Sequence, residues 1–414
     1  MANPKLRFKE FIEPWETKPL NSVFSLFSGF AFPSSASCDN GVRWLKISDV
    51  GIQAMVCSNP SYLPHELKEK YPEFIVNKDE YVIALTRPIL NKQLKLAKVG
   101  EIYDGALLNQ RVAKLISKSS NVDFVYFLLQ KSDIIELLAN SIAGSDPPNL
   151  SLSEIKNINL TIPRIEEQTK IANFLTAVDG KISQLNEQHQ LMIQYKKGVM
   201  QKIFSQEIRF KDDNGEEFEK WKECTLSQLA YSYTGLSGKN KDDFGSGFAY
   251  ITYKQIFDNR KIDLSKVEFV EISNDEKQNQ VKKNDLFFTT SSETPEEVAF
   301  CSVLLDEFNS PIYLNSFCFG VRPKNQNELN SVYASFYFKS DSFRKKILHL
   351  AQGSTRYNIS KKEFMEIDFL LPCVGEQVKI ANYLSALDQN IEILAKQIEH
   401  AKAWKKGLLQ QMFV

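Results

Sequence analysis

The sequence predicts an α+β protein made of two similar mixed globules in tandem, each followed by a long helix. Three observations lead to this prediction. Residues 149–204 and 358–413 repeat one another at a constant offset of 209 without a gap, and about 22 of their 56 positions are identical. Each copy carries a heptad pattern of apolar residues, which predicts a long helix. Shorter matches run through the rest of both halves, so the chain is a tandem duplication.

Each copy of the repeat opens with a short strand that ends at a proline. Alternating apolar residues precede Pro163 and Pro372, and a proline commonly closes a strand. Acidic residues follow at once, Glu166 and Glu167 in the first copy and Glu376 in the second, as the first turn of a helix favours. A long helix is therefore expected to begin directly after each proline.

The two predicted helices carry matching apolar seams at spacings of four and three residues. The pattern holds for five heptads, so each helix of about 40 residues is roughly 60 Å long. Two such helices in one chain most simply pair with each other, although the seams also contain polar positions, Lys196 and Lys405. The residues predicted to pair the helices or to dock a partner are Ile171, Leu175, Val178, Ile182, Leu185, Ile380, Leu384, Leu387, Ile391 and Leu394.

The duplication extends over the whole chain. Matches at offsets of 206 to 209 align, for example, Trp15 with Trp221 and Leu20 with Leu226. The predicted boundaries are 1–162 for the first globule, 163–206 for its helix, 207–371 for the second globule and 372–414 for its helix. The predicted strands are 44–50, 80–85 and 112–116 in the first half and 250–256, 286–290 and 317–321 in the second, with globule helices at 123–138 and 331–350.

Composition separates this chain from several classes of protein. The 51 Lys and Arg residues balance 51 Asp and Glu residues, whereas proteins that neutralise phosphates commonly carry a basic excess. The six cysteines form no Cys-x-x-Cys pair and the four histidines are scattered. We therefore expect no metal site, and thiols of a reducing compartment. No apolar run has the length of a membrane span, and no signal peptide precedes the first globule, so a cytoplasmic protein without membrane contact is expected.

A search for catalytic motifs finds no complete constellation. Asp146-Pro147-Pro148-Asn149 resembles the tetrapeptide with which adenine-N6 methyltransferases hold the target amino group. Asn149, however, stands where an aromatic residue would stack on the flipped base. Gly235–Asn240 is too short for a phosphate-binding loop. Because neither copy holds a catalytic set, we expect a binding protein with no catalytic residue, metal or cofactor of its own.

Two globules that share a fold but differ in their residues, each joined to a similar helix, suggest a ruler. Double-stranded DNA suits a ruler, because its half-sites recur about every 34–36 Å. Residues 87–118 hold seven Lys and Arg against two acidic residues, a local excess that the neutral total conceals. Arg, Gln and Asn can read base edges, whereas Lys mostly meets phosphates. The candidate DNA contacts are Arg43, Trp44, Lys46, Arg87, Lys92, Lys95, Lys98, Gln110 and Arg111 in the first half, and Tyr253, Lys254, Gln255, Ser291, Ser292, Arg356 and Tyr357 in the second.

The repeated motifs resemble those of a known family. Residues 167–179 and 376–388 share the pattern Glu-Gln-x-Lys-Ile-Ala-Asn-[Phe/Tyr]-Leu-x-Ala-x-Asp, and both long helices end in Lys-Lys-Gly-x-x-Gln-x-x-Phe. A loop with Gly-Ser followed by Asn-[Leu/Ile]-Ser precedes each block. With these motifs present twice in register, the chain resembles, over its whole length, the DNA-specificity subunit of type I restriction–modification systems.

This resemblance implies more than the spacing shows. In that family each globule is a target recognition domain that reads one half of a bipartite DNA site. The two helices pack as an antiparallel coiled coil, set the spacer and help to dock two modification subunits, which hold S-adenosylmethionine and methylate adenine. Two restriction subunits, motor-nucleases that use ATP, then join. The resemblance therefore assigns S-adenosylmethionine, ATP and Mg²⁺ to partner subunits and no catalysis to this chain. The family's recognition residues follow no fixed motif, so the DNA contacts named above depend on composition and loop position alone.

Two other functions stay open at the level of sequence. One is an enzyme with methyltransferase or nuclease activity in this chain, which S-adenosylmethionine binding or Mg-dependent cleavage by the isolated chain would support. The other is a protein-interaction scaffold with coiled-coil arms and no DNA contact, which absent or salt-insensitive DNA binding would favour.

Overall fold

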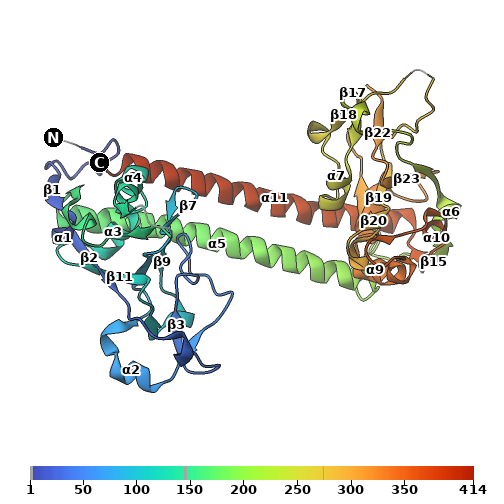
Figure 1. The fold of residues 1–414 in the computed structure, drawn as a ribbon. Coiled ribbons are helices and arrows are strands. Elements are labelled where there is room, and N and C mark those ends of the chain that lie inside the picture. Colours follow the sequence, from blue (N-terminus) through green and yellow to red (C-terminus); the bar gives the residue numbers. More distant parts are fainter. Residues whose placement is uncertain (1–2, 144–146, 274) are drawn as a thin grey trace. The chain divides into compact units, whose positions relative to one another are not determined.

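The computed structural model describes residues 3–143, 147–273 and 275–414. It divides into two units, formed by residues 1–186 with 396–414 (unit 1) and by residues 187–395 (unit 2). Each unit contains one globule and one segment from each of the two long helices, α5 (Ile165–Phe204) and α11 (Val374–Gln411) (Figure 1).

Unit 1 is built on two four-stranded sheets. The first is antiparallel, with the order β2-β11-β6-β9, and the second has the order β4-β3-β10-β5 with β3 and β10 parallel. Their strands are β2 (Phe24–Ser28), β11 (Val112–Ser117), β6 (Tyr81–Ala84), β9 (Leu96–Lys98), β4 (Tyr62–Leu63), β3 (Val42–Leu45), β10 (Ala106–Leu108) and β5 (Ile75–Val76). The two-stranded pairs are β1 (Glu16–Pro19) with β14 (Asn159–Ile162), β7 (Ile89–Leu90) with β8 (Gln93–Leu94), and β12 (Ile142–Ala143) with β13 (Asn149–Leu150). The shorter helices are α1 (Leu20–Val23), α2 (Glu66–Lys70), α3 (Val122–Leu128) and α4 (Ser132–Asn140).

Unit 2 repeats this plan. Its sheets have the orders β16-β23-β19-β21 and β18-β17-β22, and β17 and β22 are again the parallel pair. Their strands are β16 (Ala230–Thr234), β23 (Cys318–Pro323), β19 (Leu286–Thr289), β21 (Cys301–Val303), β18 (Glu268–Val270), β17 (Phe244–Ile251) and β22 (Ile312–Leu314). The two-stranded pairs are β15 (Lys222–Thr225) with β25 (Asp368–Leu371), and β20 (Ser291–Ser292) with β24 (Tyr357–Asn358). The shorter helices are α6 (Leu226–Leu229), α7 (Tyr253–Asp258), α8 (Ser331–Tyr337), α9 (Asp341–Ile347) and α10 (Lys361–Met365).

The predicted fold class is confirmed, and the two long helices pair antiparallel. Within unit 1, Ile171 and Leu175 near the start of α5 share a core with Leu408 near the end of α11. Within unit 2, Ile203 near the end of α5 shares a core with Ile380 near the start of α11. Of the predicted seam residues, Ile171, Leu175, Val178, Leu185, Ile380, Leu384 and Leu387 are buried, and Ile182, Ile391 and Leu394 are half-buried. None of the helices formed by the described residues is both long and apolar enough to cross a membrane.

Several predicted elements are shorter than their apolar runs. The strand predicted at 250–256 stops at Ile251, because the Thr252 hydroxyl accepts the backbone N–H of Gln255 and starts α7. The strand predicted at 44–50 stops at Leu45, where the Asp49 carboxylate accepts the N–H of Lys46 at 2.8 Å and turns the chain. The helices predicted at 123–138 and 331–350 are each broken in two, into α3 with α4 and α8 with α9.

A buried glutamate anchors the start of each long helix to the N-terminal segment of its own half. In unit 1, Glu167 accepts two hydrogen bonds of 2.7 Å from the Arg7 guanidinium and one of 3.3 Å from the Trp15 indole. In unit 2, Glu376 accepts bonds of 3.2 and 2.7 Å from Arg209 and one of 2.9 Å from Trp221. The side chains of Glu167 and Glu376 are only 3% and 1% exposed. Each buried carboxylate thus forms a bidentate pair with a partly buried guanidinium, the geometry that best compensates for lost hydration.

The next residue, a glutamine, ties the same helix start to the globule. Gln168 accepts the backbone N–H of Asn121 at 2.9 Å and donates to the Pro163 carbonyl at 2.8 Å. Gln377 makes the matching bonds to Asn330 and Pro372, both at 2.9 Å. Asn121 and Asn330 are the N-caps of α3 and α8. The repeated Glu-Gln pair therefore fixes each long helix against two separate parts of its globule.

Ion pairs between the long helices also occur twice. In unit 1, Lys405 of α11 lies 2.7 Å from Asp179 of α5. In unit 2, Lys196 of α5 pairs with Asp388 of α11. Each ammonium also lies over a phenylalanine of its globule, at 5.5 Å from the ring of Phe127 and 5.3 Å from that of Phe336. The polar seam lysines thus join opposite helices, and a polar pair at a seam position specifies register.

Removing the buried carboxylate should destabilise unit 1, because Glu167→Ala leaves the partly buried guanidinium of Arg7 and the Trp15 indole without an acceptor. We expect the free energy of unfolding to fall by about 3 kcal/mol. Glu166→Ala is the matched control, since Glu166 is exposed one residue earlier, and it should cost less than about 1 kcal/mol. Urea unfolding followed by tryptophan fluorescence measures both variants, and equal losses would contradict the anchor.

Candidate nucleic-acid interface

In each unit, three chain segments meet beside two adjacent strands through the same backbone hydrogen bonds. In unit 1 the N–H of Leu85 donates to Arg111 and the N–H of Leu150 donates to Leu85, both at 2.8 Å. In unit 2 the N–H of Thr290 donates to Phe317 at 2.9 Å, and that of Ile359 donates to Thr290 at 3.0 Å. We call these segments the loop cluster: residues 85–87, 109–111 and 147–150 in unit 1, and residues 290–292, 315–317 and 356–359 in unit 2.

The loop cluster of unit 1 presents polar side chains around a small cavity. Gln110 and Arg111 are exposed at the turn that precedes β11. The Thr86 hydroxyl donates to the Asn149 side chain at 2.5 Å and links the first and third segments. All four residues line a cavity of about 350 Å³. The amide of Gln110 and the guanidinium of Arg111 therefore line the same cavity, and both are groups that can form bidentate bonds to base edges.

The backbone beside this cavity adopts conformations that side chains rarely favour. Arg87 is exposed, has a φ of 48°, and donates its N–H to the Pro148 carbonyl at 2.8 Å. The β7–β8 hairpin follows, with Asn91 and Lys92 at φ of 50° and 60° in its two-residue turn, as a type I′ turn requires. Lys92 is exposed at this tip. Left-handed backbone at non-glycine residues is often found at binding sites, and in unit 2 the corresponding stretch is a 3-10 turn, Pro295–Glu297.

The loop cluster of unit 2 has the same frame with different side chains. Ser291 and Ser292 are buried in the β20–β24 pair, and the Tyr253 hydroxyl donates to the Ser291 carbonyl at 2.6 Å. Burial raises the pKa of Tyr253, so the phenol stays a donor at neutral pH. Arg356 and Phe317 are exposed, and the guanidinium lies 5.6 Å from the ring centre. Tyr357 is half-buried next to Arg356.

Besides Ser291 and Ser292, three of the predicted contacts lie in the interior, outside the loop clusters. Trp44 is 3%, Gln255 6% and Arg43 9% exposed. The Arg43 guanidinium donates to the Tyr62 hydroxyl, the Tyr103 hydroxyl and the Cys57 thiol, and Gln255 donates to the Lys266 carbonyl at 2.6 Å. Without a change in conformation, these side chains can act on a ligand only through the segments that they support.

The remaining predicted lysines differ in their exposure to solvent and in the contacts that hold their ammonium groups. Lys254 is exposed on α7, and Lys46 lies 4.0 Å from the centre of the Trp44 ring. Lys95 is half-buried and donates to the Ile47 carbonyl at 2.8 Å, and burial lowers the pKa of its ammonium. Lys98 is exposed and pairs with Asp79 at 2.9 Å. Lys254 and Lys92 thus reach solvent with the fewest constraints of this group.

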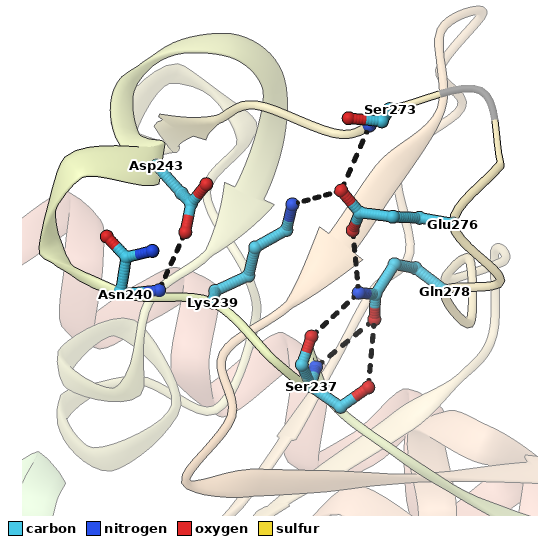
Figure 2. Close-up of polar contacts among 7 residues, drawn as sticks. All are labelled: Ser237, Lys239, Asn240, Asp243, Ser273, Glu276 and Gln278. Carbon is cyan, nitrogen blue, oxygen red and sulfur yellow. Dashed lines mark hydrogen bonds and ion pairs between the residues drawn. The ribbon is translucent and has the colours of Figure 1, made fainter.

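Residues 235–240, which the sequence analysis compared with a phosphate-binding loop, are bound by side chains of a neighbouring loop of unit 2. Figure 2 shows Lys239 bound to Glu276, and Gln278 bound to both Glu276 and Ser237. The Lys239 ammonium lies 2.6 Å from the Glu276 carboxylate. The Lys239 side chain is 5% exposed. Its pairing lowers the pKa of Glu276 to about 2, so the carboxylate stays charged across the neutral range. The lysine therefore joins two loops of unit 2.

Sequence reasoning missed four residues of the loop clusters. Thr86 and Asn149 bridge the cluster of unit 1, Asn358 of unit 2 matches Asn149, and Phe317 stands at the place of Arg111. The sequence held a signal for the two asparagines, because Asn149 and Asn358 open the two copies of the repeat at the same position.

Asp146 of the methyltransferase-like tetrapeptide lies outside the described residues. Among the residues described, no three His, Cys, Asp or Glu side chains gather as a metal site would require.

Comparison with known proteins identifies the family. The model of the type I restriction modification DNA specificity domain matches residues 12–194 and, a second time, residues 218–403. The chain belongs to this family. The tandem duplication found in the sequence thus corresponds to two specificity domains in one chain, and each domain contains one loop cluster.

Individual relatives agree with the family. The type I restriction enzyme MjaVIII specificity subunit of Methanocaldococcus jannaschii is 32% identical over 212 residues, which are 51% of this chain and 50% of that protein, so this match spans half the relative's length. The EcoKI specificity subunit of Escherichia coli K12 is 21% identical over 97% of this chain and 88% of its own length. The crystal structure of the type I restriction-modification S subunit from M. genitalium superposes with a TM-score of 0.56 at 16% identity, covering 100% of this chain and 99% of that one. This last likeness concerns the fold.

Removing one exposed guanidinium from the loop cluster of unit 1 should weaken DNA binding and relax its sequence preference. We expect Arg111→Ala to cost about 1–3 kcal/mol of binding free energy if the side chain reads a base. Lys118→Ala is the matched control: Lys118 follows the other end of β11, roughly 20 Å away at about 3.3 Å per residue. Fluorescence anisotropy at several salt concentrations compares the variants, and equal affinities would remove Arg111 from the interface.

Proposed function

We propose that this chain is the DNA-specificity subunit of a type I restriction–modification complex and that each unit reads one half of a bipartite site. The observation that carries the proposal is the loop cluster itself. Its backbone frame occurs twice, yet its exposed side chains differ between the units. A constant frame with variable side chains is what two readers of two different sequences require.

The two clusters suggest different modes of reading. In unit 1, Gln110 and Arg111 supply amide and guanidinium groups, and the Lys92 hairpin supplies a cation that can meet a phosphate. In unit 2, Arg356 and Phe317 supply a guanidinium and an exposed ring, which suit a polar contact beside an apolar one. The half-sites should therefore differ in sequence, and the complete site should be asymmetric.

The long helices set the distance between the half-sites in this proposal. Their antiparallel pairing and the ion pairs of Lys405 with Asp179 and Lys196 with Asp388 hold one register. With the register of the helices fixed, we expect a spacer of constant length between the half-sites. Large apolar side chains exposed on the helices suit the docking of modification subunits: Leu191, Ile193, Tyr195, Ile393 and Trp404.

Catalysis belongs to the partners in this proposal. Modification subunits hold S-adenosylmethionine and methylate adenine, and restriction subunits use ATP and Mg²⁺. This chain contributes recognition and assembly, and double-stranded DNA is its direct ligand.

A methylome tests the proposal most broadly. The chain is expressed with its modification subunit in a host that lacks DNA methylation, and N6-methyladenine is mapped by single-molecule sequencing. We expect a two-part motif with a fixed gap. Exchanging residues 22–142 for the corresponding globule of a related subunit should alter one half of the motif and leave the other half and the gap unchanged.

The control is the unmodified chain with the same modification subunit. Altered sequence in both halves after the exchange would contradict separate reading by the two units. Absent methylation from a stable complex with an active partner would favour a scaffold without DNA contact.

A further inference from the structure

Unit 2 contains a cavity of about 460 Å³ with a concentration of positive charge. Its walls combine the junction of α8 and α9 with the 3-10 turn Pro295–Glu297. The residues that matter here are Lys339, Arg344 and Lys345 among the cations, Glu296 and Asp341 among the acids, and the ring of Phe300. A cavity of this size is within the range that holds small ligands.

Lys339 is largely buried at this cavity without a counter-ion. In the described part of the chain, no hydrogen bond or ion pair reaches its ammonium. The pKa of Lys339 is lowered to about 8, chiefly by burial and also by the nearby cations Arg260 and Lys196, while Cys301 and Asp388 act in the opposite direction. Asp388 is the nearby carboxylate; it is half-buried and already pairs with both Arg260 and Lys196. Among the described residues, the ammonium of Lys339 therefore has no carboxylate paired with it directly.

Arg344 is held rigidly beside the same cavity. Its guanidinium donates to the backbone carbonyls of Ala299, at 3.1 Å, and Glu296. It also lies 5.0 Å from the centre of the Phe300 ring. Burial lowers the pKa of Arg344 to about 10, so the group stays charged at neutral pH. Asp341, the acid at the rim, instead accepts a hydrogen bond from Gln201 at 2.7 Å.

Unit 1 shows that the fold does not need this unbalanced charge. Lys131 occupies the position that corresponds to Lys339 at an offset of 208, and it pairs with Asp133 at 2.7 Å. At the same offset Glu136 stands in the place of Arg344. The two units thus share the lysine, but Arg344 and Lys345 of unit 2 have no cationic counterpart in unit 1, where Glu136 and Leu137 stand. An unpaired buried ammonium is costly, which points to an external anion.

We propose that the cavity of unit 2 binds a phosphate group between Lys339 and Arg344. A phosphate dianion or diester would supply the missing negative charge to two cations that are already in place. The group could be carried by a free nucleotide or by the backbone of bound DNA. This site is separate from the loop cluster and goes beyond the proposed function.

Thermal unfolding of the full chain tests the site with inorganic phosphate and with AMP, each against sodium chloride at equal ionic strength. We expect both anions to raise the Tm of the native chain and to have a much smaller effect on Lys339→Met. This variant should itself have a raised Tm without ligand, because it removes an unpaired buried charge while keeping the apolar stem. Lys131→Met is the matched control and should keep the full response to phosphate.

Equal phosphate shifts in the native chain and in Lys339→Met would overturn the proposal, since phosphate also stabilises proteins without a site. The salt dependence of DNA binding distinguishes the two sources of the phosphate group, bound DNA and a free nucleotide. If Lys339→Met reduces the slope of log affinity against log salt by about one, the phosphate belongs to DNA. If the slope is unchanged while the AMP response is lost, the ligand is a free nucleotide.

Discussion

The structure depends on the buried Glu-Gln pair at the start of each long helix. Glu167 and Glu376 bring the N-terminal segment of each half onto its helix through an arginine and a tryptophan. Gln168 and Gln377 bind the same turn to the cap of a globule helix. A long helix without such ties would swing on a single peptide connection. With them, the direction of the helix is set by the globule that precedes it.

A lysine near the end of each long helix binds an aspartate of the other long helix. Lys405 of the second helix belongs to unit 1, and Lys196 of the first helix belongs to unit 2. Each unit is therefore built from both halves of the sequence, and its core includes the end of the helix that started in the other half. This explains why the two repeated blocks are more alike in sequence than the two globules are. Their side chains must fit one another as well as their own unit.

The sequence predicted the architecture because duplication and heptads are local, repeated signals. It also predicted the exposed Gln110, Arg111 and Arg356 as candidate contacts, and these residues lie in the loop clusters of the two units. It could not separate these from Trp44 and Gln255, which are of suitable types but point into cores. Burial is decided by contacts between distant segments, and no local pattern encodes them. The hydrogen bonds of Thr252 and Asp49 shortened strands for the same kind of reason, since a cap overrides an apolar run.

The most direct measurement of the central claim is site-specific photo-crosslinking in the assembled complex. A photoreactive phenylalanine analogue is placed at Gln110 in one preparation and at Arg356 in another, and the crosslinked nucleotides are mapped on a duplex that carries the methylation motif. The account predicts crosslinks from Gln110 in one half-site and from Arg356 in the other, with none in the spacer. Crosslinks from both positions to the same half-site, or to no DNA at all, would contradict it.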